Sequence, residues 1–144
     1  MLKGIPSLLS PELLKVLMEM GHGDELVLAD GNFPAASHAG RLIRCDGHPI
    51  PGLLDAILTF FPLDTYTQFP LAVMQVVPGD PVVPVIWDEY KALVRKHEPH
   101  NEKFEQVERF AFYERAKKAY AIVSTSEKAL YANLILKKGV VTGS

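Results

Sequence analysis

The segment Met20–Pro34 reads MGHGDELVLADGNFP, and it contains the pattern that decides the fold. Its apolar run, Glu25–Ala29, stands between a glycine-flanked histidine, His22, and an aspartate, Asp30, that opens a loop. A short apolar run between turn residues is typical of a strand buried on both faces. Such strands occur in sheets that carry helices on both sides, so the segment favours an α/β fold.

The rest of the chain alternates helical and extended patterns. Ser10-Pro11-Glu12 predicts a helix start with Ser10 as N-cap, and Gly21 is predicted to end that helix. Residues 31–40, GNFPAASHAG, are predicted to be a loop. Three further helices are predicted, around residues 53–61, over 85–97 and over 110–118. Extended segments are predicted at residues 41–45, 71–77, 104–108, 120–124 and 133–137. The alternation predicts a three-layer α/β/α fold with a largely parallel sheet, in one domain spanning residues 1–144.

Charge and cysteine content limit the classes of function. Fifteen basic and seventeen acidic side chains give a net charge of −2, and no basic run or stripe of aromatic residues with arginine suggests a nucleic-acid partner. Cys45 is the only cysteine, so no intrachain disulfide can form and we expect a cytoplasmic protein. No apolar stretch approaches the roughly 20 residues that a membrane span needs, so no membrane partner is expected.

His22 and Asp30 are the first candidate functional residues. Histidine moves protons reversibly near neutral pH, and the flanking glycines leave its ring uncrowded. The alternative is structural, with Gly21 as the C-cap and His22 near the negative end of the helix dipole. Asp30 lies at the carboxyl end of a predicted strand, where ligands of α/β sheets collect, although aspartate before Gly-Asn is also ordinary turn chemistry.

Later residues offer further hydrogen-bonding groups. Arg109 precedes an aromatic run and carries a planar fork that suits sugar hydroxyls, or else it is a solvated helix-start residue. Tyr131 and Asn133 stand just before the last strand, where they bind a ligand or simply form a turn. His97-x-x-His100 alone does not make a zinc site, so we predict no metal centre. Neither GxGxxG nor GxxxxGK[ST] occurs, so no nucleotide site is predicted.

Two longer stretches carry a family resemblance. SPELLKVLMEMGHGDELVLADGNFP resembles the amino-terminal signature of the sugar mutarotase family that contains D-ribose pyranase and L-fucose mutarotase. RFAFYERAKKAYAIV followed by YANLILKKGV resembles the L-fucose branch more closely than the ribose branch. The resemblance covers nearly the whole chain and is weakest over residues 78–106.

The resemblance implies an isomerase that interconverts the α and β anomers of L-fucose by acid/base-assisted ring opening and closure. It extends to pyranose and furanose forms of related sugars such as ribose. It implies no cofactor and a homo-oligomeric assembly, with a decameric ring favoured. Exposed apolar residues would also favour assembly, and we expect Phe60, Phe61, Phe69 and Trp87 to contribute to such patches.

The resemblance also assigns roles at matching positions. His22 matches the catalytic acid/base, and the substrate-binding positions are Asp30, Arg109, Tyr131, Ala132 and Asn133. Ala132 departs from the family, which usually has glycine there. Whether Tyr131 relays a proton or only binds stays open.

Two other classes of function remain as alternatives. A sugar-binding or regulatory module without turnover would use Asp30 and Arg109 but would not need His22. A metal-dependent hydrolase would use His97 and His100, but no carboxylate-rich partner set accompanies them in the sequence.

Overall fold

The computed structural model describes residues 1–143; Ser144, the last residue of the predicted domain, lies outside them. Within residues 1–143, six strands form one sheet in the order β2-β5-β1-β6-β3-β4. The strands are β1 (Glu25–Ala29), β2 (Leu42–Cys45), β3 (Leu71–Met74), β4 (Phe104–Val107), β5 (Ala121–Thr125) and β6 (Leu134–Lys137). Only β6 runs antiparallel to its neighbours among these described strands. The prediction of a largely parallel sheet is confirmed.

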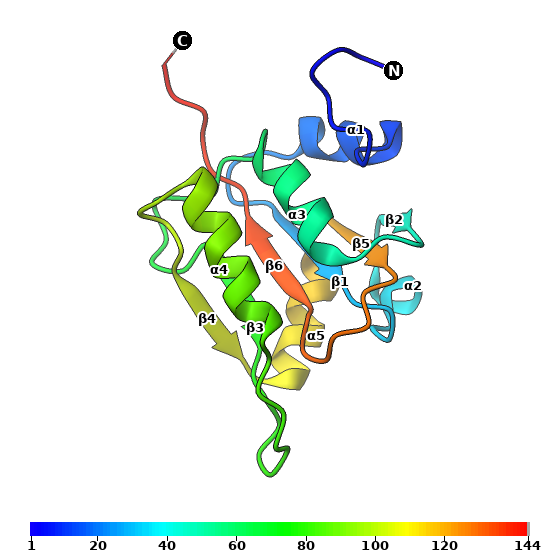
Figure 1. Cartoon of the computed structure of the whole chain (residues 1–144), viewed down its shortest axis with the longest axis vertical. Helices are drawn as coiled ribbons and strands as arrows, with labels where there is room; N and C mark the ends of the chain where they lie inside the picture. Colours follow the sequence, from blue (N-terminus) through cyan, green and yellow to red (C-terminus); the bar gives the residue numbers. More distant parts are fainter. Residues whose placement is uncertain (144) are drawn as a thin grey trace.

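Helices cover both faces of the sheet (Figure 1). One face carries α1 (Pro11–Glu19), α3 (Ile50–Leu58) and α4 (Ile86–His97), and the other carries α2 (Ala35–His38) and α5 (Arg109–Lys118). Strand β1 shows why: Leu26 and Leu28 enter the core under the first set, whereas Val27 and Ala29 enter the core under the second. The alternation of side chains along each strand therefore builds the predicted three-layer α/β/α architecture.

The direction of β6 decides which loops meet at each edge of the sheet. The register pairs Leu28 of β1 with Leu134 and Glu25 with Lys137. The segment that precedes β6 therefore lies at the carboxyl end of β1, and the segment that follows β6 lies at its amino end. Figure 1 shows the long loop between β3 and α4 projecting at the first edge, which we call the carboxyl edge, and both termini at the opposite one, the amino edge.

The start of α1 agrees with the prediction and its end does not. The Ser10 hydroxyl caps the helix, and proline occupies the first turn. The helix ends at Glu19, with Met20 as an extended C-cap, and Gly21 stays outside the left-handed region. The predicted C-cap role of Gly21 is therefore wrong. Gly23 takes the positive φ, 87°, and makes the turn into β1.

The predicted loop 31–40 contains one helical turn, α2, so the loop prediction is wrong over Ala35–His38. Pro34 sets the backbone ahead of the turn, and its carbonyl accepts a hydrogen bond from the Ser37 hydroxyl at 3.1 Å. The turn closes when the amide of Ala39 donates to the carbonyl of Ala35 at 2.8 Å. Alanine favours helix, and here it outweighs the turn residues around it.

The expected exposed aromatic patch is only partly correct. Phe60 is 43% exposed, but Phe61 is buried at 2%, and Phe69 and Trp87 are half-buried. Phe61 enters the core because it follows α3 directly and packs under α1. None of the helices within residues 1–143 is both long and apolar enough to cross a bilayer.

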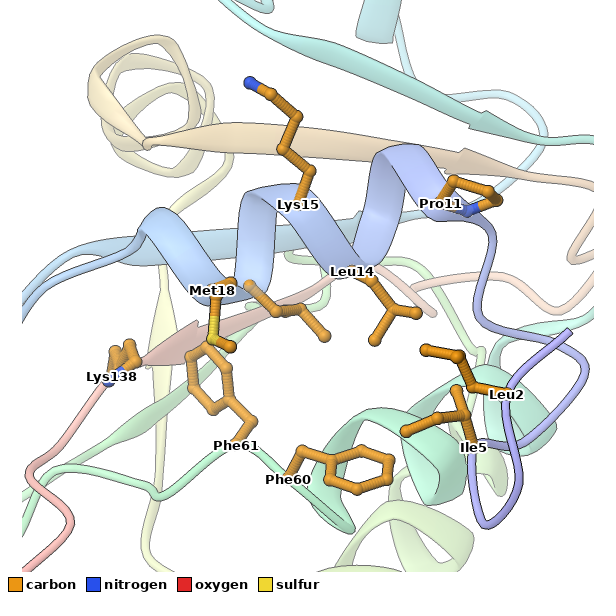
Figure 2. Close-up of a pocket in the computed structure, with 10 residues that line it drawn as sticks. Leu2, Ile5, Pro11, Leu14, Lys15, Met18, Phe60, Phe61 and Lys138 are labelled. Carbon is orange, nitrogen blue, oxygen red and sulfur yellow. The ribbon is translucent and has the colours of Figure 1, made fainter.

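An apolar hollow of about 460 Å³ lies between the N-terminal segment, α1 and the end of α3. Figure 2 shows Leu2, Leu14, Met18 and Phe60 pointing toward it, whereas Lys15 points away. Its wall offers few polar groups, and a monosaccharide needs several hydrogen-bonding partners. This hollow therefore does not suit the sugar site that the resemblance implies.

Candidate functional site

A smaller, more polar pocket of about 230 Å³ lies at the carboxyl edge of the sheet. It is lined by Asp30, Asn32, Phe33, Met74, Asp80, Tyr113, Leu130, Tyr131 and Asn133. The pocket thus brings together three residues predicted from the sequence: Asp30, Tyr131 and Asn133. About a hundred positions separate Asp30 from the other two in the sequence. They meet because β6 runs antiparallel beside β1. Aromatic and apolar walls with a few convergent polar groups suit a small polyhydroxylated ligand.

Asp30 is fixed by backbone contacts from both sides. Its amide donates to Oδ1 of Asn133 at 2.8 Å, and its own Oδ1 accepts from the amide of Asn32 at 3.0 Å. Burial raises the pKa of the Asp30 carboxyl, and the negative charge of Glu127 raises it further. Backbone hydrogen bonds from Asn32 and Phe33 lower this pKa, but the net shift is upward. The charged form is therefore costly in this pocket, and hydroxyl donors from a ligand would relieve that cost.

Tyr131 has an unusual backbone. Its φ of 57° is the only positive value for a non-glycine residue within residues 1–143. Such a conformation costs roughly 1–3 kcal/mol and persists only where the surroundings hold it. Here the indole of Trp87 donates to the Tyr131 carbonyl at 2.8 Å, and the hydroxyl of Tyr90 donates to the Ala132 carbonyl at 2.6 Å. Helix α4 therefore fixes the segment that carries Tyr131 and Asn133.

The Tyr131 hydroxyl lies in a network with the loop after β3. It donates to Oδ2 of Asp80 at 2.6 Å and accepts from the amide of Val77 at 3.2 Å. The bond to Asp80 raises the pKa of Tyr131, so the phenol stays protonated at neutral pH. Sequence analysis missed Asp80, since an aspartate in a Pro-Gly-Asp turn gives no sign of its distant partner.

Arg109 and Ala132 contribute less directly. Arg109 is the first residue of α5, is exposed, and stacks its guanidinium over Phe110 at 4.6 Å. Its charge lowers the pKa of Tyr131, opposing Asp80, so it lies close to the pocket without lining it. The Ala132 methyl packs in the hydrophobic core, so the departure from glycine does not reach the pocket wall.

His22 lies at the other end of β1. The five residues of that strand, at about 3.3 Å each, separate it from Asp30 by roughly 16 Å or more. Its Nε2 is 3.0 Å from Oδ1 of Asp64, and its ring centroid is 5.2 Å from that of Tyr66. Within one chain, the structure therefore does not bring His22 to the pocket.

Asp64 orients the His22 ring. Burial raises the pKa of the Asp64 carboxyl. Hydrogen bonds from the Tyr66 amide and from His22 lower this pKa by more than burial raises it, so the net shift is downward. The ionised carboxylate can only accept hydrogen bonds, so Nε2 of His22 carries the hydrogen and Nδ1 is left for other partners. The His22 side chain is 46% exposed, so its ring is accessible.

His97 and His100 have different surroundings. Nε2 of His97 lies 2.7 Å from Oδ1 of Asp55, which also accepts from Lys96, and His100 is exposed. Within residues 1–143, no three histidine, cysteine, aspartate or glutamate side chains are grouped to hold an ion. His97 is therefore best explained as a partner in a surface ion-pair cluster.

The fold and the pocket define a class: an α/β protein with a polar, aromatic-walled pocket at the carboxyl edge of its sheet, suited to a small polyhydroxylated ligand. The chain belongs to the RbsD / FucU transport protein family, whose profile matches residues 3–141.

Relatives and solved structures are similar along nearly the full length. The chain is 59% identical to the fucose mutarotase of Danio rerio, covering 97% of this chain and 94% of that one. It is 55% identical to the L-fucose mutarotase of Actinobacillus pleuropneumoniae, covering 97% of both chains. The crystal structure of the fucose mutarotase from Streptococcus pneumoniae in complex with L-fucose is 56% identical and covers 98% of this chain and 100% of that one, with a TM-score of 0.94.

Proposed function

We propose that this protein is an isomerase that interconverts the α and β anomers of L-fucose, with the chain acting as one domain. The observation that carries the proposal is the polar pocket of Asp30, Tyr131 and Asn133, in a chain 56% identical to a fucose mutarotase solved with L-fucose. The proposal extends to pyranose and furanose forms of related sugars such as ribose.

The reaction needs two proton movements. Opening the hemiacetal ring requires a proton delivered to the ring oxygen and one removed from the anomeric hydroxyl, and closure on the other face reverses both. His22 supplies the proton shuttle, because its imidazole is accessible and Asp64 holds the ring in one orientation. Asp30 and Asn133, with Arg109 nearby, hold sugar hydroxyls. Positioned acid/base catalysis contributes about 10²–10⁴-fold, which suits a reaction that proceeds slowly in water.

We further propose that each site is shared between two copies of the chain, with His22 of one copy reaching the Asp30 pocket of the next. The separation along β1 supports this, because one chain alone keeps the proton shuttle away from the hydroxyl-binding residues. A contact between the amino edge of one copy and the carboxyl edge of another is head-to-tail, and such contacts form a ring when the rotation between successive copies closes. The decameric ring implied by the resemblance is the assembly that we favour.

The apolar hollow beside α1 supports assembly with further copies. Met18 is 88% exposed and Leu2 is 71% exposed, and both border this hollow at the amino edge, where His22 also lies. Exposed apolar groups gathered in one place usually mark protein–protein contacts.

We place the protein in the cytoplasm. Cys45 is the only cysteine and is a buried free thiol, as suits a reducing compartment.

Saturation-transfer NMR tests the activity directly. One anomeric proton of L-fucose is saturated, and the loss of signal from the other anomer reports exchange, with D-ribose measured alongside and buffer as the control. We expect exchange of L-fucose well above the buffer rate. Absence of acceleration for both sugars would reject the enzyme, and sugar binding without exchange would establish the binding module instead.

A further inference from the structure

Helix α4 places a polar side chain near each edge of the sheet. Ile86, Tyr90 and Val94 recur every four positions and are buried, so they form the side of the helix that packs on the sheet. Glu98 continues this spacing as the C-cap residue. Eight positions at about 1.5 Å each place Glu98 roughly 12 Å from Tyr90 along the helix axis. The helix runs from the carboxyl edge toward the amino edge (Figure 1).

Tyr90 acts at the carboxyl edge. Its side chain is fully buried, and its hydroxyl donates to the Ala132 carbonyl at 2.6 Å. A phenylalanine would fill the same space with no hydroxyl to desolvate, so this hydroxyl costs free energy unless the bond to Ala132 compensates for it. Three positions earlier on the same helix, the Trp87 indole holds the adjacent Tyr131 carbonyl. The two bonds fix consecutive peptide groups directly before Asn133, which lines the pocket.

Glu98 acts at the amino edge. Its Oε2 accepts from the amide of Leu63 at 2.8 Å, and its Oε1 accepts from the side-chain amide of Asn101 at 3.3 Å. The same Asn101 nitrogen donates to the Asp64 carbonyl at 3.2 Å. Glu98 and Asn101 therefore hold residues 63 and 64 from the end of α4. Asp64 is the residue that orients the His22 ring.

We propose that α4 positions both halves of the site, with Tyr90 holding the sugar-binding segment and Glu98 holding the segment of Asp64. The inference rests on the proposed anomer exchange and adds two residues that do not line the pocket. Because the two contacts lie at opposite ends of one helix, each residue should govern a different property. Tyr90 sets the affinity for the sugar, and Glu98 sets the rate of exchange once the sugar is bound.

Tyr90→Phe removes only the buried hydroxyl. The Ala132 carbonyl loses its partner and the segment before β6 relaxes, so we expect the dissociation constant of L-fucose to rise about tenfold. Exchange at saturating sugar, measured by saturation transfer, should change less than about threefold. Trp87→Phe releases the neighbouring carbonyl and should act in the same direction. Tyr120→Phe is the matched control, because it removes a hydroxyl that bonds Glu19 outside the pocket and should keep the wild-type affinity.

Glu98→Ala should give the reverse result. Residues 63 and 64 lose their contact with α4, so Asp64 is less well placed. We expect exchange at saturating sugar to fall about tenfold, with the dissociation constant within about threefold of the wild type. Glu98→Gln should recover most of the rate, since its amide oxygen can still accept from the Leu63 amide. Glu89→Ala removes an exposed carboxylate of the same helix and should match the wild type.

A second readout does not depend on turnover. In ¹⁵N-histidine spectra, with His22→Ala to assign the signal, wild-type His22 should be the Nε2–H tautomer. Glu98→Ala should show a mixture of tautomers, whereas Tyr90→Phe should not.

Two results would overturn the positioning roles. One is wild-type affinity and rate in both variants, and the other is affinity and rate that fall together in both, which would indicate a general loosening of the fold. A wild-type protein that does not accelerate exchange would instead overturn the proposed function. In that case the His22 tautomer would still decide the role of Glu98, and sugar binding would still decide the role of Tyr90.

Discussion

At the scale of single residues, the candidate site trades stability for binding. Asp30 is only 8% exposed, and burial raises the pKa of its carboxyl, so the folded protein carries a charge that it would be more stable without. Such a group is retained where its charge has a use, and we propose that here it accepts hydrogen bonds from sugar hydroxyls. Removing the charge should therefore raise the stability of the fold and weaken sugar binding.

Asp30→Asn is expected to stabilise the fold while weakening sugar binding by roughly tenfold, the loss expected for one charged hydrogen bond. Below the unfolded pKa of about 3.9, both states of the wild type are protonated and the two proteins should be equally stable. Between the unfolded pKa and the raised folded pKa, the unfolded wild type is ionised while the folded Asp30 keeps its proton, so the wild type loses stability as the pH rises. The advantage of the variant should therefore grow over this window and level off above the folded pKa.

Melting temperatures of both proteins between pH 3.5 and 8 check this, with L-fucose titrations at pH 7. An Asp30→Asn variant that melts below the wild type at neutral pH would show that the carboxylate stabilises the fold instead.

Residues of the candidate site could be predicted from the sequence where a polar side chain lies next to the end of a strand. Asp30, Tyr131 and Asn133 flank strands that the apolar pattern marks, and the structure places all three in one pocket. Asp64 and Asp80 were not predictable, since their partners lie 42 and 51 residues away along the chain. No local pattern distinguishes such aspartates from ordinary turn residues.

At the scale of elements, β6 organises both edges of the sheet. Because β6 runs antiparallel to β1, Asn133 just before it lies beside Asp30. At the other end of the sheet, the residue after β6, Lys138, forms a β-bridge with Leu63. The strand could be predicted from the sequence, but its direction could not, because a short apolar run carries no information on whether a strand is parallel or antiparallel to its neighbours. The single turn of α2 was missed for a related reason, since one turn is too short to show helical periodicity.

Gly139 tests the amino edge of this arrangement. A Cβ there would lie 2.7 Å from the carbonyl carbon of Leu63 and 2.9 Å from Cα of Asp64, so the backbone that positions Asp64 must shift. We expect Gly139→Ala to lower the free energy of unfolding by about 1–3 kcal/mol and to reduce anomer exchange, because His22 loses its oriented partner. Gly40→Ala is the control, since a Cβ there meets nothing within 4 Å.

Urea denaturation and saturation transfer on both variants provide the comparison. Equal stability and equal exchange for Gly139→Ala and the wild type would show that the edge adapts and that the position of Asp64 is not critical.

At the scale of the whole molecule, the two parts of the proposed site lie at opposite edges of the sheet. The hydroxyl-binding pocket is at the carboxyl edge, and His22 with Asp64 is at the amino edge. His22 and Asp30 are close in the sequence, but the extended strand between them carries them far apart in space. We propose that assembly of copies brings both parts to one sugar.

Mixing two inactive variants tests this shared site most directly. In the proposed site, His22→Ala removes the proton shuttle and Tyr131→Phe removes a hydroxyl of the sugar pocket, so each alone should lose most exchange activity while staying folded. If sites are shared, co-refolded mixtures contain interfaces where an intact His22 meets an intact Tyr131 pocket. Random mixing in equal amounts should then restore about a quarter of the wild-type exchange rate. A mixture that stays as inactive as the separate variants, although light scattering shows mixed oligomers, would contradict the shared site.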